Sequence, residues 1–325
     1  MSATELERVA RLAVSFRAFG AACEGIDVGI GDDAAVLVPR PGERLAWTVD
    51  AQVEGTHFRR SLVSWHDVGW RATMAAASDL AAMGARPWCA LAALVLAEDV
   101  DDGALDAIVA GQRAAVDALG AAMVGGNLAR GSEVSITTTW LGRSERFVER
   151  RGGRAGDALW MAGDVGLAAV GLRALVAGVN DARVGDAVAR WQRPRALIDA
   201  GLKMAAVAHA AIDVSDGLAH DVAQLARASG VRAVLDADML LAHAGDALER
   251  AATAIGADAL ELALHGGEDY ALVVASDVAI EGFVRIGELR AGEGIALVTG
   301  SAERELTPRG FDHFARQTTR PTGDD

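Results

Sequence analysis

Apolar residues recur along the chain with two different periods, and the two periods alternate. Around residues 105–119 they return every three to four positions, which predicts a helix with one buried face. Residues 134–140 alternate apolar and polar side chains, which predicts a half-buried strand. The nearly continuous apolar run at 88–96 predicts a strand that is buried on both faces. Because helical and strand patterns keep alternating, we predict layered α/β or α+β domains and no solenoid repeat.

The predicted elements fall into two groups, separated by a stretch rich in arginine and glycine. Helices are predicted at residues 6–19, 67–84, 105–119, 167–177, 194–210 and 218–229. Strands are predicted at residues 45–53, 88–96, 134–140, 158–163 and 233–236, at the start of 211–230, and near 272, 286 and 296. Residues 142–156 (GRSERFVERRGGRAG) are typical of a connection between domains. We therefore predict an N-terminal domain at residues 1–143 and a C-terminal α+β domain at residues 144–325.

The amino-acid composition limits which binding partners and which cellular compartment we expect for the protein. The 325 residues suffice for two domains with buried cores. A formal net charge of −14 without any basic run argues against nucleic acid as the main partner, and a phosphorylated substrate would require metal ions or local arginines. Cys23 and Cys89 lie far apart, which favours a reducing cytoplasm over a disulfide framework or zinc site. The longest apolar run, at 87–97, is shorter than the roughly 20 residues of a membrane span, and no signal peptide is visible. We expect a soluble cytoplasmic protein.

Residues 211–230 (AIDVSDGLAHDVAQLARASG) combine a strand end, an acidic turn and a helix. Apolar positions after the turn follow the helical period, and Gly230 stands where a helix ends. We expect Ser215 or Asp216 to cap the first turn, where the helix dipole stabilises a carboxylate. Together, Asp213 and Asp216 form a candidate site for Mg²⁺. Taken alone, the segment is explained as well by an N-cap with a solvated turn.

Similar acidic or glycine-rich turns recur at predicted strand ends. They contain Asp32-Asp33, Asp50, Gly125-Gly126-Asn127, Asp213 with Asp216, and Gly266-Gly267-Glu268-Asp269, and Asp79 adds an acid from a helix. Since strand ends meet at one edge of a sheet, we expect these groups to converge in one crevice. Carboxylates at short range repel one another unless cations neutralise them. Several Mg²⁺ ions in one crevice indicate a polyphosphate ligand.

The usual nucleotide-binding motifs are absent from the sequence. The single lysine, Lys203, precedes a methionine, so no GxxxxGK[ST] loop exists. The paired motifs of protein kinases, a GxGxxG that opens a helix after a strand, and a GxSxG elbow are also missing. A chain that binds ATP without these motifs must hold it through metal ions and backbone groups.

Seven segments match a known family in order and spacing. They are GIGDDAAVL (29–37), TVDAQVEGTHF (48–58), ASDLAAMGA (77–85), VGGNLARG (124–131), AIDVSDGL (211–218), GGEDYAL (266–272) and RGFDHF (309–314). Through them the chain resembles the thiamine-monophosphate kinases of the aminoimidazole ribonucleotide synthetase superfamily. The resemblance implies an N-terminal α/β domain that dimerises through its sheet and a C-terminal α+β domain that closes over the cleft. It further implies a homodimer that uses ATP and several Mg²⁺ ions per site to convert thiamine monophosphate to thiamine diphosphate.

The resemblance also implies a role for each matching residue. Implied ligands of Mg²⁺ are Asp33, Thr48, Asp50, Asp79, Asn127, Asp213 and Asp216, with Asp50 and Asp216 also implied to be catalytic. Implied contacts of ATP are Gly126, Asn127, Arg150 and Ser215. Implied contacts of thiamine monophosphate are His57, Glu268 and Phe311, whose ring would stack on the substrate. The family often has aspartate at the position of Asn127, so the amide would hold one metal more weakly.

Several of these residues also fit ordinary structural roles when each is taken alone. His57 is typical of a surface loop, Arg150 of a solvated linker, Phe311 of a core aromatic and Glu268 of a turn cap. The expected mechanism is direct transfer of the γ-phosphate without a phosphoenzyme. Two alternatives stay open: another ATP-dependent synthetase of the superfamily, or a relative that binds nucleotide and metal without catalysis. Asn127 is the feature that favours the second alternative.

Overall fold

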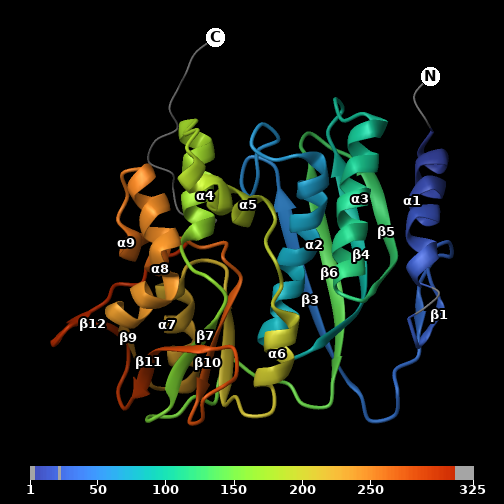
Figure 1. Cartoon of the computed structure of the whole chain (residues 1–325). Coiled ribbons are helices and arrows are strands. Elements are labelled where there is room, and N and C mark those ends of the chain that lie inside the picture. The colour runs from blue at the N-terminus through green and yellow to red at the C-terminus, as the bar shows by residue number, and fades with distance from the viewer. Residues whose placement is uncertain (1–3, 21–22, 312–325) are drawn as a thin grey trace.

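The computed structural model describes residues 4–20 and 23–311, which form two halves side by side, each built on its own β-sheet (Figure 1). The N-terminal half holds a four-stranded sheet in the order β3-β6-β4-β5. Its strands are β3 (Arg44–Val53), β4 (Arg86–Leu96), β5 (Ala122–Arg130) and β6 (Ser135–Ser144). The pair β4–β5 is parallel, whereas β6 is antiparallel to β3 and β4. A short antiparallel pair, β1 (Ile26–Val28) and β2 (Val36–Leu37), precedes this sheet.

Helices cover the inner face of this sheet, which is the face turned toward the middle of the molecule (Figure 1). They are α2 (Trp65–Ala82) and α3 (Asp102–Ala118), with α1 (Glu5–Gly20) beside α3 and β5. Ser64 begins α2 as its N-cap, since its side chain accepts the Asp67 N–H. Glycines let α2 and α3 approach closely, because a Cβ at Gly111 would lie 1.8 Å from the His66 carbonyl oxygen.

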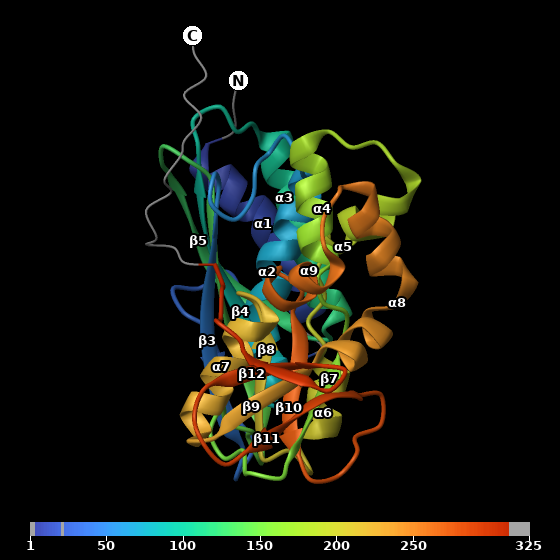
Figure 2. The ribbon, with the colours of Figure 1, turned by 90° about the vertical axis from the view of Figure 1, so that its left-hand side faces the viewer.

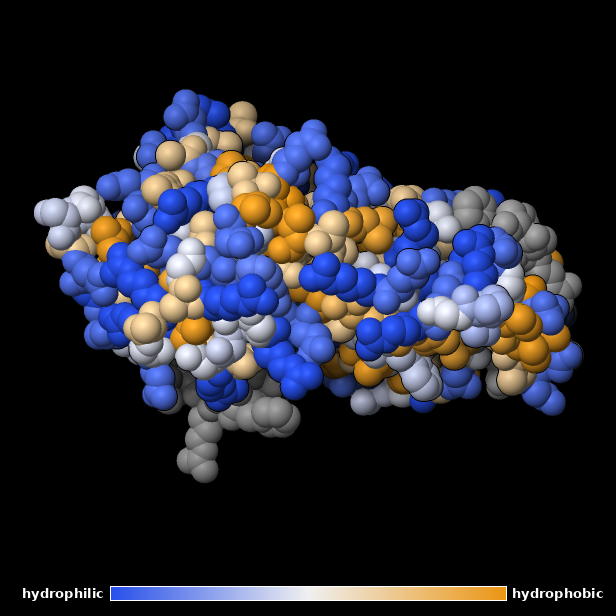
Figure 3. Space-filling model, turned by 90° about the horizontal axis from the view of Figure 1, so that it is seen from below, coloured by the Kyte–Doolittle hydropathy of each residue, from blue (hydrophilic) through white to orange (hydrophobic). Residues whose placement is uncertain are grey.

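The other face of the four-stranded sheet exposes apolar side chains. Along β3, Thr48, Asp50 and Gln52 alternate with Trp47 and Val49, which are 76% and 64% exposed. The run at 88–96, predicted to be buried on both faces, forms β4, but Leu91 is 39% exposed, so that prediction is wrong for this single chain. The sheet therefore presents an apolar outer face. Seen from below, the molecule shows a mainly polar surface interrupted by apolar areas (Figure 3).

The C-terminal half contains a seven-stranded sheet in the order β13-β12-β9-β11-β7-β10-β8. Its strands are β7 (Ala158–Ala162), β8 (Ala210–Val214), β9 (Arg232–Asp236), β10 (Ala271–Ser276), β11 (Val284–Arg290), β12 (Ile295–Thr299) and β13 (Ala302–Glu305). The helical segments are α4 (Leu167–Ala177), η1 (Ala182–Val184), α5 (Gly185–Gln192), α6 (Ile198–Met204), α7 (Leu218–Ser229), α8 (Ala237–Ala254) and α9 (Ala259–His265). Figure 2 views this half from the side, with β9, β11 and β12 in front. The predicted mixture of helices and sheets in two halves is confirmed.

The two faces of the seven-stranded sheet pack differently. One face forms the main core with α4, α7, α8 and α9. The other face, at β7, β10 and β8, packs against α6 and the C-terminal end of α2. Close contact between α2 and α6 depends on Gly201, where a Cβ would lie 2.2 Å from the Ala81 carbonyl oxygen. Helix α2 therefore joins the halves and places its C-terminal turns beside β8.

Local predictions hold best for isolated, strongly periodic helices. The helices predicted at 167–177 and at 218–229 are confirmed as α4 and α7, and Gly230 ends α7 in the left-handed conformation (φ 68°). The helix predicted at 194–210 is wrong in extent, because only Ile198–Met204 is helical. The preceding α5 ends at Gln192, before Pro194, and was not predicted. The division between residues 143 and 144 stays a prediction.

The Gly-Gly-Asn sequence at 125–127 is not a turn. It lies inside β5, opposite residues 91–93 of β4. The glycines permit close strand approach at an irregularity in the pairing, since a Cβ at Gly126 would lie 2.1 Å from the Ala92 carbonyl oxygen. Asp50 likewise lies within β3, three residues before its end. Among the described residues, no helix is both long and apolar enough to cross a membrane.

Candidate active site

A cavity of about 490 Å³ lies between the two halves of the chain. The N-terminal half contributes residues of β3, α2 and the loop after β3. The C-terminal half contributes residues of α4, α5 and β8, of the loops after β8 and before β10, and of the segment after β13. Eight residues predicted from the sequence to form a site line this cavity: Asp50, His57, Asp79, Asp213, Ser215, Asp216, Glu268 and Phe311. The cavity is therefore where most of the predicted site residues meet.

Three carboxylates lie at the junction of β3, α2 and β8. Asp79 accepts a hydrogen bond from the hydroxyl of Thr48 on β3. Asp213, at the end of β8, accepts one from the Ser78 hydroxyl of α2 (Oγ to Oδ2 2.7 Å). Asp50 points from the inner face of β3 into the same cavity. On α2, Asp79 supplies one carboxylate and its neighbour Ser78 holds Asp213 from the other half of the molecule. Carboxylates of both halves therefore lie close together.

These carboxylates carry an excess of negative charge that the described side chains compensate only in part. Burial raises the pKa of Asp50 and of Asp79. Burial and the neighbouring charge of Asp79 raise the pKa of Asp213 to about 6. The charge of Arg150, an exposed residue outside the cavity lining, lowers the pKa of Asp79 and Asp213 by a smaller contribution. An added cation at this point would find ionised oxygen ligands and would relieve their repulsion.

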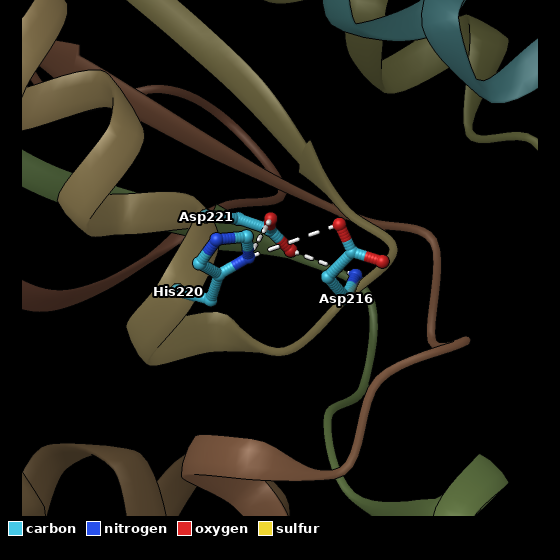
Figure 4. A group of neighbouring side chains, drawn as sticks. All are labelled: Asp216, His220 and Asp221. Atoms are coloured by element: carbon cyan, nitrogen blue, oxygen red, sulfur yellow. Dashed lines mark hydrogen bonds and ion pairs between the residues drawn. The ribbon is translucent and has the colours of Figure 1, made fainter. Parts of the chain in front are cut away.

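The Asp216 turn carries a second group of ligand atoms, shown in Figure 4. Asp216, His220 and Asp221 each place one ligand atom within 4.8 Å of the others. The Nδ1 atom of His220 lies 3.8 Å from Asp216 Oδ2 and 3.5 Å from Asp221 Oδ1. The structure therefore adds His220 and Asp221 to the acidic turn that the sequence pointed to.

The predicted cap of α7 by Ser215 or Asp216 is wrong. Gly217 is the N-cap residue, and it lacks a side chain. Instead, Asp221 folds back from the first turn, where its Oδ2 accepts the N–H groups of Asp216 and Gly217, each at 3.1 Å. Burial and the charge of Asp216 raise the pKa of Asp221 to about 7. Asp221 thus fixes the backbone of the turn that presents Asp216.

A strained loop before β10 forms another part of the cavity wall. Among the described residues, Glu268 (φ 58°) and Tyr270 (φ 52°) are the non-glycine residues with positive φ. The Glu268 N–H donates to the Ser215 carbonyl oxygen (2.7 Å), and the Tyr270 N–H donates to that of Val214 (2.8 Å). This backbone pairing ties Glu268 to the strand that leads into the Asp216 turn, and strained backbone of this kind is concentrated at functional sites.

His57 and Phe311 complete the lining. The Val53 N–H donates to His57 Nδ1 (3.0 Å), so in the neutral ring the proton lies on Nε2. The Phe311 side chain is 49% exposed, and its N–H donates to the Asp216 carbonyl oxygen (3.2 Å). The rest of the matching segment, residues 312–314, lies outside the described residues.

Three predicted residues lie elsewhere in the single chain. Asp33, Gly126 and Asn127 line a second cavity of about 520 Å³ beside Trp47 and Leu91, on the outer side of the four-stranded sheet. Gly126 is separated from Asp50 by three strand spacings, through the paired residues Thr138 and Ala92, or about 14 Å. The expectation that all the acidic and glycine-rich segments converge in one crevice is therefore wrong within one chain.

Asp269, the neighbour of Glu268, points away from the cavity. Its carboxylate accepts the N–H groups of Gly166 (2.8 Å) and Ala168 (3.2 Å) at the start of α4. Loss of surrounding water raises its pKa from the ordinary value of 3.8 to about 7. Asp269 is thus a structural residue rather than part of the predicted site.

This raised pKa predicts a pH dependence of stability. Between the two pKa values, the folded protein keeps a proton that the unfolded chain has released, so the free energy of unfolding falls as pH rises from about 4 to 7. Asp269→Asn removes the titrating group, and the decline should become shallower by at most about 1.4 kcal/mol per pH unit. Denaturant unfolding of both ligand-free proteins near pH 5 and near pH 7 measures the fall in the free energy of unfolding. If the fall is as steep in the Asp269→Asn variant as in the unaltered protein, the prediction is wrong.

Comparison with known proteins places the chain in a family. Residues 31–144 match the model of the AIR synthase related protein N-terminal domain, and residues 154–300 match that of the C-terminal domain. The thiamine-monophosphate kinase of Aquifex aeolicus is 32% identical over 291 residues, which cover 88% of this chain and 92% of the relative. The chain belongs to the thiamine-monophosphate kinase family. The family member from Salmonella typhimurium is 34% identical over 308 residues, 89% of this chain and 93% of its own.

This chain also has the fold of a solved structure from the family. The solved structure of AaThiL complexed with AMPPCP and TMP superposes with a TM-score of 0.78 at 31% identity, over 85% of this chain and 89% of that one. The predicted family and two-domain fold are therefore confirmed. The roles of single residues stay predictions, with their placement as described above.

Five residues that line the cavity or contact its lining residues were not predicted from the sequence. They are Gln52, Arg71, Trp191, His220 and Asp221. His220 follows Asp216 by four positions, a helical spacing that could have identified it. Arg71 precedes Asp79 by eight positions, which places both on one face of α2. No comparable local signal marks Trp191, because its contact depends on the packing of α5 against a distant loop.

Proposed function

We propose that this protein transfers the γ-phosphate of ATP to the phosphate of thiamine monophosphate, forming ADP and thiamine diphosphate. The observation that supports this most directly is the cavity itself, which brings carboxylates from both halves of the chain together with Glu268 and His57. Its chain is related throughout to thiamine-monophosphate kinases, one of which is known with AMPPCP and TMP bound. The reaction is a direct displacement without a phosphoenzyme.

The carboxylate end fits Mg²⁺. Asp50, Asp79, Asp213 and Asp216 supply hard oxygen ligands, and burial raises the pKa of the first three, with neighbouring carboxylates adding to the rise for Asp79 and Asp213. Thr48 orients Asp79, and Ser78 orients Asp213. Bound Mg²⁺ supplies charge neutralisation between the two anionic reactants. We propose Asp50 and Asp216 as the residues on which the rate depends most.

The remaining residues bind and orient the substrates. The acceptor phosphate is ionised at neutral pH, so the reaction needs no general base, and positioning dominates. Ser215 lines the cavity and Arg150 lies close enough to affect the pKa of Asp213, and both would contact the phosphates of ATP. His57, Glu268 and Phe311 surround the rest of the cavity and would hold thiamine monophosphate.

We propose a homodimer that joins the two cavities. The outer face of the four-stranded sheet exposes Trp47, Val49 and Leu91, and among the described strands its edge strands β3 and β5 each pair with one neighbour. Two such sheets related by a two-fold axis can close into a barrel, in which β3 of one copy lies beside β5 of the other. This places Asp33, Gly126 and Asn127 of the partner subunit near Asp50. A cytoplasmic location also stays a prediction.

The test of the function is the product. The purified protein is incubated with ATP, Mg²⁺ and thiamine monophosphate, and thiamine diphosphate and ADP are measured by chromatography. We expect equal amounts of both products, with none when Mg²⁺ is chelated. Binding of both substrates without thiamine diphosphate would indicate the non-catalytic relative. ADP and free phosphate without thiamine diphosphate would indicate another ATP-dependent reaction.

A further inference from the structure

We infer that Arg71 and Trp191 are positioning residues that fix the carboxylate of Glu268 for an aromatic ring with an amino or cationic edge. This inference rests on the proposed function, since such a ring is the part of thiamine monophosphate that lies away from its phosphate. The two residues come from α2 and α5, and Glu268 comes from the strained loop before β10.

Each oxygen of Glu268 has its own donor. Arg71 donates from Nη2 to Oε1, and the indole Nε1–H of Trp191 donates to Oε2 (2.7 Å). The Arg71 side chain is only 1% exposed, whereas that of Glu268 is 27% exposed and lines the cavity. Because a carboxylate offers about four acceptor positions, the two donors leave others directed to the cavity. Glu268 is thus rigidly held and still accessible to a ligand.

Arg71 is itself held in a single orientation. Its Nη1 donates to the Trp191 carbonyl oxygen, and its Nε donates to Gln52 Oε1 (3.3 Å). The guanidinium also lies over the Trp191 ring, 4.8 Å from the centroid. These contacts use the planar fork of the guanidinium, which a lysine ammonium cannot reproduce. Loss of either side chain would free the carboxylate to rotate.

The length of α2 relates this group to the phosphate end of the cavity. Arg71 and Asp79 are separated by eight residues, or about 12 Å of helix, and Ala75 between them lines the cavity. Trp191 contacts Glu268, and the apolar side chains of Leu62, Leu172 and Val176 also line the cavity. A ligand extended along α2 would meet apolar walls and a fixed carboxylate at one end. At the other end it would meet the carboxylate cluster.

A purely structural role is the alternative, because Arg71 also links the two halves of the chain. The two roles differ in their kinetic consequences. A structural defect lowers stability and disturbs ATP and acceptor alike, whereas a positioning defect raises KM for thiamine monophosphate selectively. Trp191→Phe is the sharpest probe, since it keeps a ring beneath Arg71 and removes only the indole N–H. Arg71→Lys keeps the charge and removes the fork.

The experiment measures KM for each substrate, kcat and Tm for these two variants. We expect KM for thiamine monophosphate to rise about ten-fold, with KM for ATP and kcat changed less than about two-fold. Trp140→Phe is the matched control: Trp140 is equally buried, and its Nε1–H donates to the Thr73 carbonyl oxygen away from the cavity. The control should leave KM for thiamine monophosphate unchanged.

A double-mutant cycle tests whether Trp191 acts through Glu268. In a Glu268→Ala background, Trp191→Phe should have no further effect on KM, because the carboxylate that it positions is gone. Additive effects, or a rise in KM no greater than that of Trp140→Phe, would overturn the inference. These outcomes all require that the unaltered protein forms thiamine diphosphate. If the unaltered protein forms none, the proposed function itself fails, so the two failures can be distinguished.

Discussion

Replacing Asp216 by asparagine is expected to lower kcat by at least about 10³-fold, equivalent to roughly 4 kcal/mol of transition-state stabilisation. The substitution keeps the size of the side chain and removes one negative charge from the cavity. The Asp216 side chain is 38% exposed, and its carboxylate forms an ion pair with His220 at 3.8 Å. The backbone of the turn is held separately by Asp221. Tm should therefore change by no more than a few degrees.

Two further measurements make this prediction specific. Calorimetric titration with Mg²⁺ and a non-hydrolysable ATP analogue should show weaker metal binding by the variant. Asp246→Asn is the matched control, since it removes the same charge from an 87% exposed side chain on α8 and should leave kcat unchanged. Normal turnover of the Asp216 variant at saturating Mg²⁺ would mean that the assignment of this residue is wrong.

The elements that the sequence predicts well are those that local patterns specify. Helix α7 shows its apolar period and its terminal Gly230 within 13 residues, so no distant contact is needed to recognise it. The segment Gly125–Asn127 misleads because glycine and asparagine are typical of turns. Here, pairing with β4 determines its conformation instead, and the glycines serve close strand approach. Tertiary contacts therefore override the local preference.

The same distinction applies to the site. Acidic motifs predict the group formed by Asp50, Asp79, Asp213 and Asp216, because each motif is short and its spacing is characteristic. Arg71 could not be found in this way, since its partner Glu268 is 197 positions away and the arginine looks like any polar residue of a helix. The separation of Asp33 from this group is likewise invisible in the sequence, since it depends on the order of strands in the sheet.

That separation leads to the second large effect, which is restoration of activity by mixing two inactive variants. Asp33→Asn and Asp216→Asn are each expected to be nearly inactive. In a dimer that contains one copy of each, the cavity with intact Asp216 also receives the intact Asp33 of the partner subunit. The other cavity carries both defects. The purified mixed dimer should therefore regain about half of the unaltered activity, because one of its two sites is complete.

The measurement uses two affinity tags to isolate the mixed dimer after co-expression, followed by the thiamine diphosphate assay. Asp50→Asn with Asp216→Asn is the control pair. Both residues line the same cavity of one chain, so every site in that mixed dimer keeps one defect and no activity returns. If Asp33 instead acts on its own chain, the Asp33 and Asp216 pair behaves like the control. Because the two arrangements predict half activity or none, this experiment decides whether the apolar outer face of the sheet joins two incomplete sites into working ones.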